Sequence, residues 1–175
     1  EYSVKTISYD AFINNTELVR VIIPEGVDSI GNNAFAGCST IRFIEFPSTI
    51  RYFGQNAFAG CSSMDFVSVN SSNADLNLRN YLPNNQSMTL YVPEGRSGGY
   101  KDVNLENSWK TKFGDRIYEG KMEIKSFEIN GLEMKFVCAT NKNSSNNKAT
   151  LYTYDTDISF VEIPSKIYTY TVVGI

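Results

Sequence analysis

Residues 18–38 read Leu18-Val-Arg-Val-Ile-Ile-Pro-Glu-Gly-Val-Asp-Ser-Ile-Gly-Asn-Asn-Ala-Phe-Ala-Gly-Cys38, and residues 41–61 read Ile41-Arg-Phe-Ile-Glu-Phe-Pro-Ser-Thr-Ile-Arg-Tyr-Phe-Gly-Gln-Asn-Ala-Phe-Ala-Gly-Cys61. The two stretches are related by a constant offset along the chain, so that Pro24 corresponds to Pro47 and Gly31 to Gly54. A fixed period of this length is typical of a solenoid, in which one short structural unit is repeated.

Each repeat unit begins with apolar residues spaced as L-x-x-L-x-L, a pattern that predicts a short strand with one buried face. In the first quoted unit these residues are Leu18, Val21 and Ile23. The proline that follows cannot donate a hydrogen bond to a strand ladder, so it ends the strand. A second apolar pair, a corner glycine and a helical turn containing Ala-Phe complete the unit. Because one coil cannot bury its apolar side alone, stacked coils are expected to form the core.

The same frame extends in both directions from the two clear coils. It gives a partial coil at residues 2–17, a degenerate coil at residues 64–86 and then a fourth strand. Further on, residues 96–113 predict an amphipathic helix with Trp109 and Phe113 on one face. A solenoid has to cover its exposed end, and we expect this helix to be the cover.

One corner position of the coils is held by small residues. Cys38 and Cys61 hold it in the two clear coils, and the frame places Asn15 and Asn84 there in the flanking coils. An asparagine at this corner is expected to bond free backbone groups. The two cysteines are predicted to be buried, unreactive thiols, because free cysteine is usually buried and stacked side chains point in parallel. A redox pair is the alternative interpretation.

The last third of the chain has a different pattern of apolar and polar residues. Apolar and polar residues alternate between Met122 and Cys138, and Asn130-Gly131 in the middle is the strongest short-range signal for a hairpin. Residues 150–154 and 159–163 complete a predicted small antiparallel set.

These patterns predict two domains. The first is a solenoid with its cap at residues 1–120, and the second is a β-hairpin region at residues 121–175 that leads into a further repeat-type strand. Residues 170–175 have the same Y-x-V-x-x-I spacing as residues 2–7. We therefore expect a further repeat array to follow in the natural protein.

Composition excludes several classes of function. Lys and Arg total 16 and Asp and Glu total 19, a net charge of −3, so no strong positive field attracts nucleic acid or anionic lipid. The absence of histidine removes the usual base of serine and cysteine nucleophiles and a common zinc ligand. Three cysteines form neither a disulfide framework nor a metal-binding CxxC pair. We expect no cofactor, no metal, no catalytic residues and no membrane-spanning segment.

The string I-x-I-P-x-x-V-x-x-I-G-x-x-A-F-x-x-C resembles the BspA-like leucine-rich repeat family of bacterial cell-surface proteins. The string runs from Ile22 to Cys38. A second copy, in which Phe46-Pro47 stands at the position of Ile-Pro, runs up to Cys61. The segment from Leu90 to Phe113 is similar to the terminal cap of that family. The resemblance implies a surface or secreted protein with adhesive or protein-binding roles and no catalytic activity. It implies no fixed functional residues.

The expected fold is α+β but β-rich: a leucine-rich repeat solenoid with 23-residue coils, a C-terminal cap and a small antiparallel β-hairpin region. The expected function, which rests mainly on the resemblance, is noncatalytic binding of another protein or of a host or matrix component. The protein is expected at the cell surface or outside the cell, after removal of a signal peptide. The alternatives are a structural spacer within a larger surface protein and an accessory glycan-binding domain.

A binding face is predicted where the strands turn side chains away from the core. One column of outward positions begins with Arg20 and the other with Ile22. The candidate binding residues in these columns are Arg20, Ile22, Phe43, Glu45, Phe66, Ser68 and Tyr91. Contiguous exposed apolar area marks interaction sites, which favours a ligand face around the two phenylalanines. The alternative is that the C-terminal hairpins cover this sheet and bury both rings.

Overall fold

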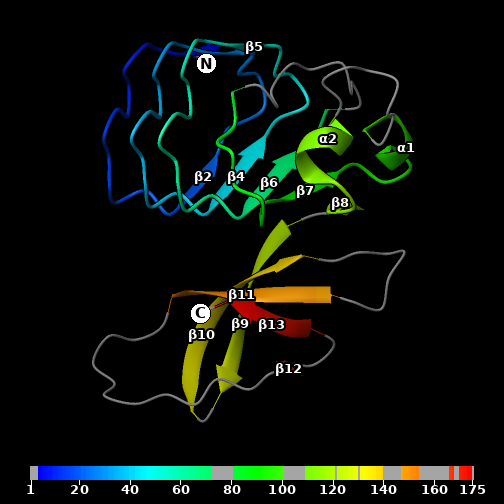
Figure 1. Cartoon of the computed structure of the whole chain (residues 1–175). Coiled ribbons are helices and arrows are strands. Elements are labelled where there is room, and N and C mark those ends of the chain that lie inside the picture. The colour runs from blue at the N-terminus through cyan, green and yellow to red at the C-terminus, as the bar shows by residue number, and fades with distance from the viewer. Residues whose placement is uncertain are drawn as a thin grey trace. The chain divides into compact units, whose positions relative to one another are not determined.

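The chain divides into two compact units, Glu1–Tyr118 and Glu119–Ile175 (Figure 1). The computed structural model describes residues 4–71, 81–100, 109–120, 122–129, 131–139, 147–153, 166–167 and 170–174. The two units are described separately below.

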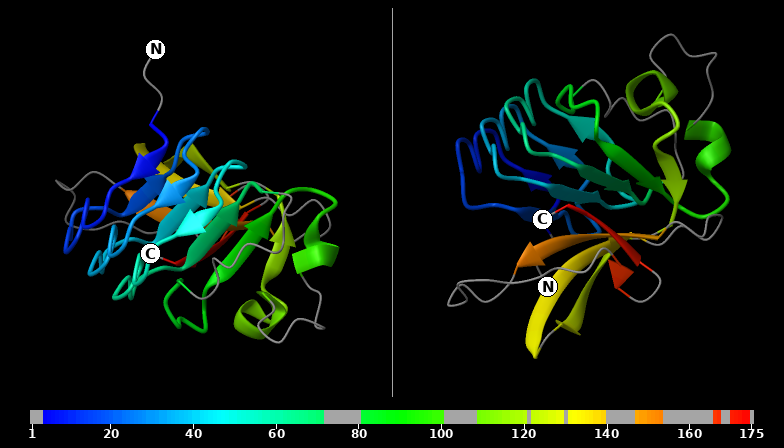
Figure 2. Two further views of the ribbon diagram at one scale, coloured as in Figure 1. Left: turned by 90° about the horizontal axis from the view of Figure 1, so that it is seen from above. Right: turned by 60° about the horizontal axis from the view of Figure 1, so that its bottom comes forward.

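The first unit is a solenoid whose coils lie side by side (Figure 2). Its five-stranded sheet has the order β2-β4-β6-β7-β8. These strands are β2 (Arg20–Ile22), β4 (Phe43–Phe46), β6 (Phe66–Val69), β7 (Thr89–Val92) and β8 (Ile117–Glu119). A second sheet has the order β1-β3-β5, formed by β1 (Thr6–Ile7), β3 (Ser29–Ile30) and β5 (Tyr52–Phe53). The β-rich solenoid predicted from the repeat is therefore confirmed.

Strand pairing in the solenoid follows the sequence period. The pairs β2–β4, β4–β6 and β6–β7 are parallel, and Arg20, Phe43, Phe66 and Thr89 are successive partners, each one repeat further along the chain. The pairs β1–β3 and β3–β5 are parallel with the same step, as in Ile7, Ile30 and Phe53. A constant step lets identical positions stack, which is what allows the coils to share one core.

Stacked aromatic rings fill the middle of that core. The rings of Phe12 and Phe35 lie 5.0 Å apart, and those of Phe35 and Phe58 lie 5.4 Å apart, and both pairs are nearly parallel. A β-carbon at Gly54 would lie 2.2 Å from the backbone nitrogen of Asn32. The repeated spacing of the corner glycines in the sequence therefore reflects close approach of adjacent coils, because neither Gly31 nor Gly54 has a positive φ.

Backbone hydrogen bonds join each coil to the next. At the helical turn, Phe12 N–H donates to the carbonyl of Ala34 at 2.8 Å, and Phe35 N–H donates to Ala57 at 2.8 Å. At this turn each coil thus donates to carbonyls of the following coil. Elsewhere the direction is reversed: Gly31 N–H donates to the carbonyl of Ile7 at 2.8 Å, and Arg42 N–H donates to that of Val19 at 2.8 Å.

Buried thiols occupy the corner, as the sequence predicts. Cys38 and Cys61 are free and fully buried, and their Sγ atoms donate to the carbonyls of Phe12 at 3.0 Å and Phe35 at 3.2 Å. Burial raises the pKa of Cys38, and burial followed by the neighbouring Cys38 raises the pKa of Cys61 to about 12. Both thiols stay protonated at neutral pH, which makes them poor nucleophiles.

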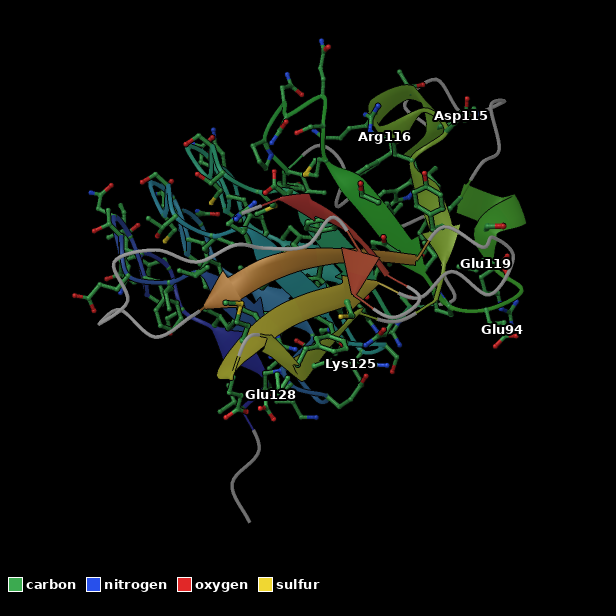
Figure 3. All side chains as sticks on the ribbon, turned by 90° about the horizontal axis from the view of Figure 1, so that it is seen from below. Glu94, Asp115, Arg116, Glu119, Lys125 and Glu128 are labelled. Carbon is green, nitrogen blue, oxygen red and sulfur yellow. The ribbon has the colours of Figure 1, made fainter. Side chains whose placement is uncertain are left out.

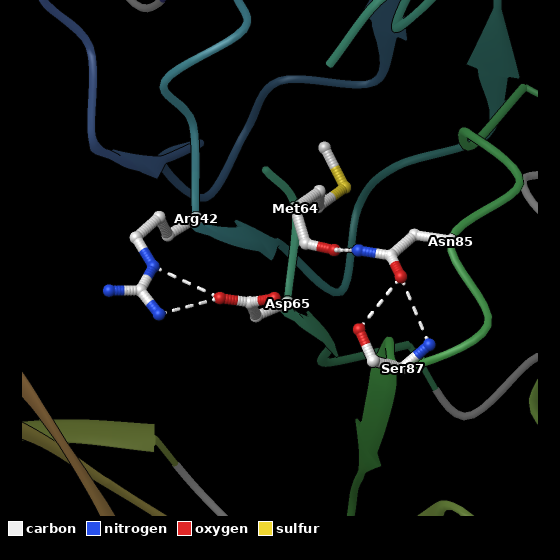
Figure 4. Close-up of polar contacts among 5 residues, drawn as sticks. All are labelled: Arg42, Met64, Asp65, Asn85 and Ser87. Atoms are coloured by element: carbon white, nitrogen blue, oxygen red, sulfur yellow. Dashed lines mark hydrogen bonds and ion pairs between the residues drawn. The ribbon is translucent and has the colours of Figure 1, made fainter. Parts of the chain in front are cut away.

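The prediction that Asn84 continues this corner is wrong by one residue. Asn84 is exposed, whereas the Oδ1 of Asn85 accepts the N–H of Ser87 at 3.0 Å and its Nδ2 donates to the carbonyl of Met64 at 2.9 Å (Figure 4). In the first coil, Asn15 Oδ1 likewise accepts an N–H two residues on, that of Glu17. The corner of the fourth coil therefore comes one position later than the repeat period predicts, although β7 resumes the register with β6.

Two short helices close the C-terminal end of the solenoid. They are α1 (Ser97–Tyr100) and α2 (Trp109–Phe113), and residues 101–108 of the predicted helix lie outside the described part. Tyr100, Trp109 and Phe113 are all buried, which is the covering role predicted for this segment. The Tyr100 hydroxyl donates to the carbonyl of Ser71 at 2.7 Å. Aromatic packing and this hydrogen bond together fix the cover onto the last coil.

Basic side chains complete the cover. Arg116, in the turn between α2 and β8 (Figure 3), donates from Nε to the carbonyl of Met88 at 2.9 Å. Lys112 donates from Nζ to the carbonyl of Leu82 at 2.8 Å, and burial lowers the pKa of Lys112. These two hydrogen bonds join the cover to the last coil.

The second unit is a five-stranded sheet with the order β12-β13-β11-β10-β9. Its strands are β9 (Met122–Ile129), β10 (Leu132–Ala139), β11 (Asn147–Thr153), β12 (Lys166–Ile167) and β13 (Tyr170–Gly174). The predicted hairpin is present, since β9 and β10 pair antiparallel with Ile129 opposite Leu132, and Gly131 has a φ of 79°. The predicted antiparallel set holds for β9–β10–β11 and for β12–β13, but β11 and β13 pair in parallel. The strand predicted at residues 159–163 lies outside the described residues.

Candidate functional site

The outward positions of β2, β4, β6 and β7 form two columns across the five-stranded sheet. Strand register aligns Arg20, Phe43, Phe66 and Thr89 in one column. It aligns Ile22, Glu45, Ser68 and Tyr91 in the other. All seven candidate residues therefore share one face of one sheet.

The candidates differ in how much of each side chain reaches solvent. Phe43 and Tyr91 are each 2% exposed and Phe66 is 8% exposed, and Ser68 is also buried. A ligand face centred on the two phenylalanines requires both rings to be accessible, and they are not. The accessible candidates are Ile22, which is 50% exposed, and the half-buried Arg20 and Glu45.

The buried aromatic candidates form a continuous row of rings. Phe43 and Phe66 are stacked with centroids 5.1 Å apart, Phe66 and Tyr91 are 6.4 Å apart, and Tyr91 and Tyr118 are 5.9 Å apart. Burial, and to a lesser extent the neighbouring Tyr118, raises the pKa of Tyr91. Such a row contributes packing area and stacking energy along the sheet.

The accessible candidates lie on the edge strand β2 and on its neighbour β4. Ile22 and Glu45 are register partners, and Glu45 Oε1 accepts a hydrogen bond from Asn70 Nδ2 at 2.9 Å. Arg20 lies two residues before Ile22 on the same face. The accessible part of this face therefore consists of an apolar side chain between one cation and one anion.

A polar hollow that the sequence analysis missed lies before these strands. It has a volume of about 460 Å³ and is lined by Val19, Thr40, Arg42, Ser63 and Asp65. Arg42 donates from Nε and Nη2 to one oxygen of Asp65, at 3.0 and 2.8 Å (Figure 4). The signal in the sequence is the opposite charge at two positions one repeat apart, which the strand-centred pattern does not include.

The described part of the chain offers little for chemistry. Within it, no group of three or more His, Cys, Asp or Glu side chains is placed to hold a metal ion. Among the same residues, the helices are all too short or too polar to cross a bilayer.

Parallel coils with a repeated strand, a buried corner and a helical cap define the class as a leucine-rich repeat solenoid, a scaffold that is typically non-catalytic. The sequence profile of the BspA type leucine rich repeat region, in 6 copies, matches residues 1–89. This chain belongs to the BspA-type leucine-rich repeat family.

Comparison with individual proteins adds one structural similarity. Among curated proteins, none matches the chain. The crystal structure of the pneumococcal vaccine antigen PcpA is similar, with 17% sequence identity and a TM-score of 0.49. The match covers 67% of this chain and 28% of the PcpA chain.

Proposed function

We propose that this chain is a noncatalytic module of a bacterial surface or secreted protein, and that it binds another protein or a host or matrix component. The BspA-type repeats over residues 1–89 support the surface location, which corresponds to the expected extracellular localisation. The net charge of −3 disfavours nucleic acid as a partner.

The observation that carries the binding proposal is the exposure of Ile22. This side chain is 50% exposed on an outer strand, although its equivalents on the inner strands are the polar Glu45 and Ser68. A large apolar group accessible between Arg20 and Glu45 gives a partner both area and charge to recognise. The binding face we propose therefore consists of the accessible candidates Arg20, Ile22 and Glu45.

A structural spacer is the second candidate function. The burial of Phe43, Phe66, Ser68 and Tyr91 favours it, because four of the seven candidate residues are withdrawn from solvent. A spacer would hold other binding modules at a distance and would have no ligand of its own.

The test measures binding of the purified chain to immobilised extracellular matrix proteins by surface plasmon resonance. Ile22→Arg should weaken binding about tenfold or more, because losing one central apolar contact costs roughly 1–2 kcal/mol. Tyr52→Arg is the matched control, since Tyr52 is 68% exposed on β5 of the other sheet. Equal affinity of the two variants would exclude the β2–β4 face, and no binding by the folded natural chain would favour the spacer.

A further inference from the structure

The polar hollow before the strands is a second potential binding site, separate from the proposed binding face. Its volume of about 460 Å³ lies within the range of small-molecule sites. The side chains that line it are Val19, Thr40, Arg42, Ser63 and Asp65. None of them belongs to the binding face proposed on Arg20, Ile22 and Glu45, so the hollow can be tested separately.

The repeat places two rows of polar side chains along this hollow. One row supplies hydroxyls, from Thr40 and Ser63, which lie one repeat apart. The other row supplies opposite charges, from Arg42 and Asp65, with the same step. Arg42 N–H donates to the carbonyl of Val19 at 2.8 Å, and Asp65 N–H donates to that of Arg42 at 3.0 Å. These backbone bonds fix the charged row before any ligand binds, which lowers the entropy cost of binding.

The ion pair in the hollow uses only part of its hydrogen-bonding capacity. Arg42 Nε and Nη2 both donate to Oδ2 of Asp65, at 3.0 and 2.8 Å, and the remaining nitrogen, Nη1, points away from the carboxylate (Figure 4). Within the part of the chain that the structure describes, no protein group bonds to Arg42 Nη1, to Asp65 Oδ1 or to the Ser63 hydroxyl. The hollow therefore offers a ligand both donors and acceptors.

This combination of groups favours a neutral ligand that carries several hydroxyls. One cation and one anion line the hollow and neutralise each other, so a charged ligand gains nothing from net charge. A zwitterion would have to compete with the existing pair for the same charges. Sugar hydroxyls can donate to Asp65 Oδ1 and accept from Arg42 Nη1 without breaking that pair. Val19 adds an apolar contact for the C–H groups of a sugar ring.

We infer that this hollow binds a neutral sugar residue of a glycan, held mainly by Arg42 Nη1 and Asp65 Oδ1. Thr40 Oγ1 donates to the carbonyl of Leu18 at 2.9 Å, so its oxygen remains an acceptor for the ligand, and the Ser63 hydroxyl can donate or accept. The affinity is weak, on the order of 1 mM, because each contact replaces a hydrogen bond to water. This binding does not depend on the protein-binding face proposed on β2 and β4.

Nuclear magnetic resonance of the isotope-labelled full chain tests the site, with the Arg42 Nε–H signal as the main reporter. The neutral probes are mannotriose, maltotriose and N-acetyllactosamine. They represent a mannan, an α-glucan and a glycoprotein glycan, so the preferred probe identifies the source of the sugar. The acidic sialyllactose and the zwitterion glycylglycine are the comparison ligands.

Two neighbouring serines provide a variant and its matched control. Ser63 is exposed, so Ser63→Gln should fold normally and place a longer neutral side chain in the hollow without removing the ion pair. Ser62 is also exposed but does not line the hollow, so Ser62→Gln makes the same chemical change outside the site.

We expect a neutral oligosaccharide to shift the Arg42 signal with an affinity that changes little with salt, because no net charge is involved. Ser63→Gln should weaken binding about tenfold by filling the hollow, and Ser62→Gln should leave it unchanged. Equal affinity of the two variants would overturn the inference, as would the absence of shifts with every neutral probe at about 20 mM. Tighter binding of sialyllactose or glycylglycine than of any neutral probe would also overturn it, because the hollow would then select charge.

Discussion

Replacing Phe35 by alanine removes the middle ring of the stack formed by Phe12, Phe35 and Phe58. Phe35 is 1% exposed and has a ring on each side, at 5.0 and 5.4 Å. Truncation of a buried phenylalanine costs about 3–5 kcal/mol, and a side chain with two stacked neighbours belongs near the upper value. We expect Phe35→Ala to lower the free energy of unfolding of the solenoid unit by about 5 kcal/mol.

Phe12→Ala is the comparison that tests the stacking argument. Phe12 makes one stacked contact and is 40% exposed, so a cost of about 2 kcal/mol is expected from its smaller buried area. Tyr52→Ala, at a side chain that is 68% exposed, should change stability by about 0.5 kcal/mol or less.

Urea-induced unfolding followed by Trp109 fluorescence measures all three variants. Trp109 is the single tryptophan and is buried within the cap of the solenoid unit. A loss for Phe35→Ala no greater than that for Phe12→Ala would refute the reasoning, because the difference between the two comes only from the second ring and the deeper burial.

Three further predictions concern contacts elsewhere in the solenoid. Gly54→Ala should lower the free energy of unfolding in urea by about 2 kcal/mol, because the new β-carbon would lie 2.2 Å from the backbone of Asn32. The control Gly98→Ala has open space around it and should be neutral or slightly stabilising. Equal effects of the two variants would contradict the close-approach argument. Arg116→Ala should cost about 1–3 kcal/mol by leaving the carbonyl of Met88 without its donor, while Lys110→Ala, which removes a pair with the exposed Asp115, should change little. The pKa of Cys61 is raised from 9.0 to about 12 in the folded state, so the stability that this thiol contributes is complete below pH 9 and is lost as the pH rises towards 12. Over that pH range the urea midpoint of Cys61→Ala should therefore fall less steeply than that of the natural chain. Rapid labelling of the folded chain by iodoacetamide at about pH 8 would show that the thiol is not buried as described.

The repeat allows most of the solenoid to be predicted from sequence. The proline, the corner glycine and the Ala-Phe pair recur in two stretches and define the step between strands, and this step gives the register of Arg20, Phe43 and Phe66. The corner of the fourth coil is not predictable in this way, because this coil lacks the Gly and Ala-Phe landmarks and because Asn85 bonds to the distant Met64. The repeat period is inferred from the Gly and Ala-Phe positions, so it cannot reveal a one-residue shift in a coil that lacks them.

For the candidate binding residues, the sequence predicts only that they are aligned on one face of the sheet. Alternation along β4 and β6 shows that Phe43 and Phe66 share a face, but alternation does not show that both rings are buried. The parallel pairing of β11 with β13 is likewise not visible in the sequence, because alternating residues are compatible with either strand direction. The ion pair between Arg42 and Asp65 lies just before the strands, outside the positions that the apolar pattern marks.

The corner of the fourth coil is shifted by one residue, whereas the register of the following strand, β7, is unchanged. Asn85 lies four residues before Thr89, whereas Cys61 lies five residues before Phe66. Strand spacing and corner placement are thus separable variables in this architecture. Recombination between related arrays, or deliberate shuffling of coils by an engineer, should tolerate junctions with mismatched corners. Chimeras should fail when the spacing between consecutive strands departs from the period that joins β4, β6 and β7, because every ring, glycine and hydrogen bond across the seam would then lose its counterpart.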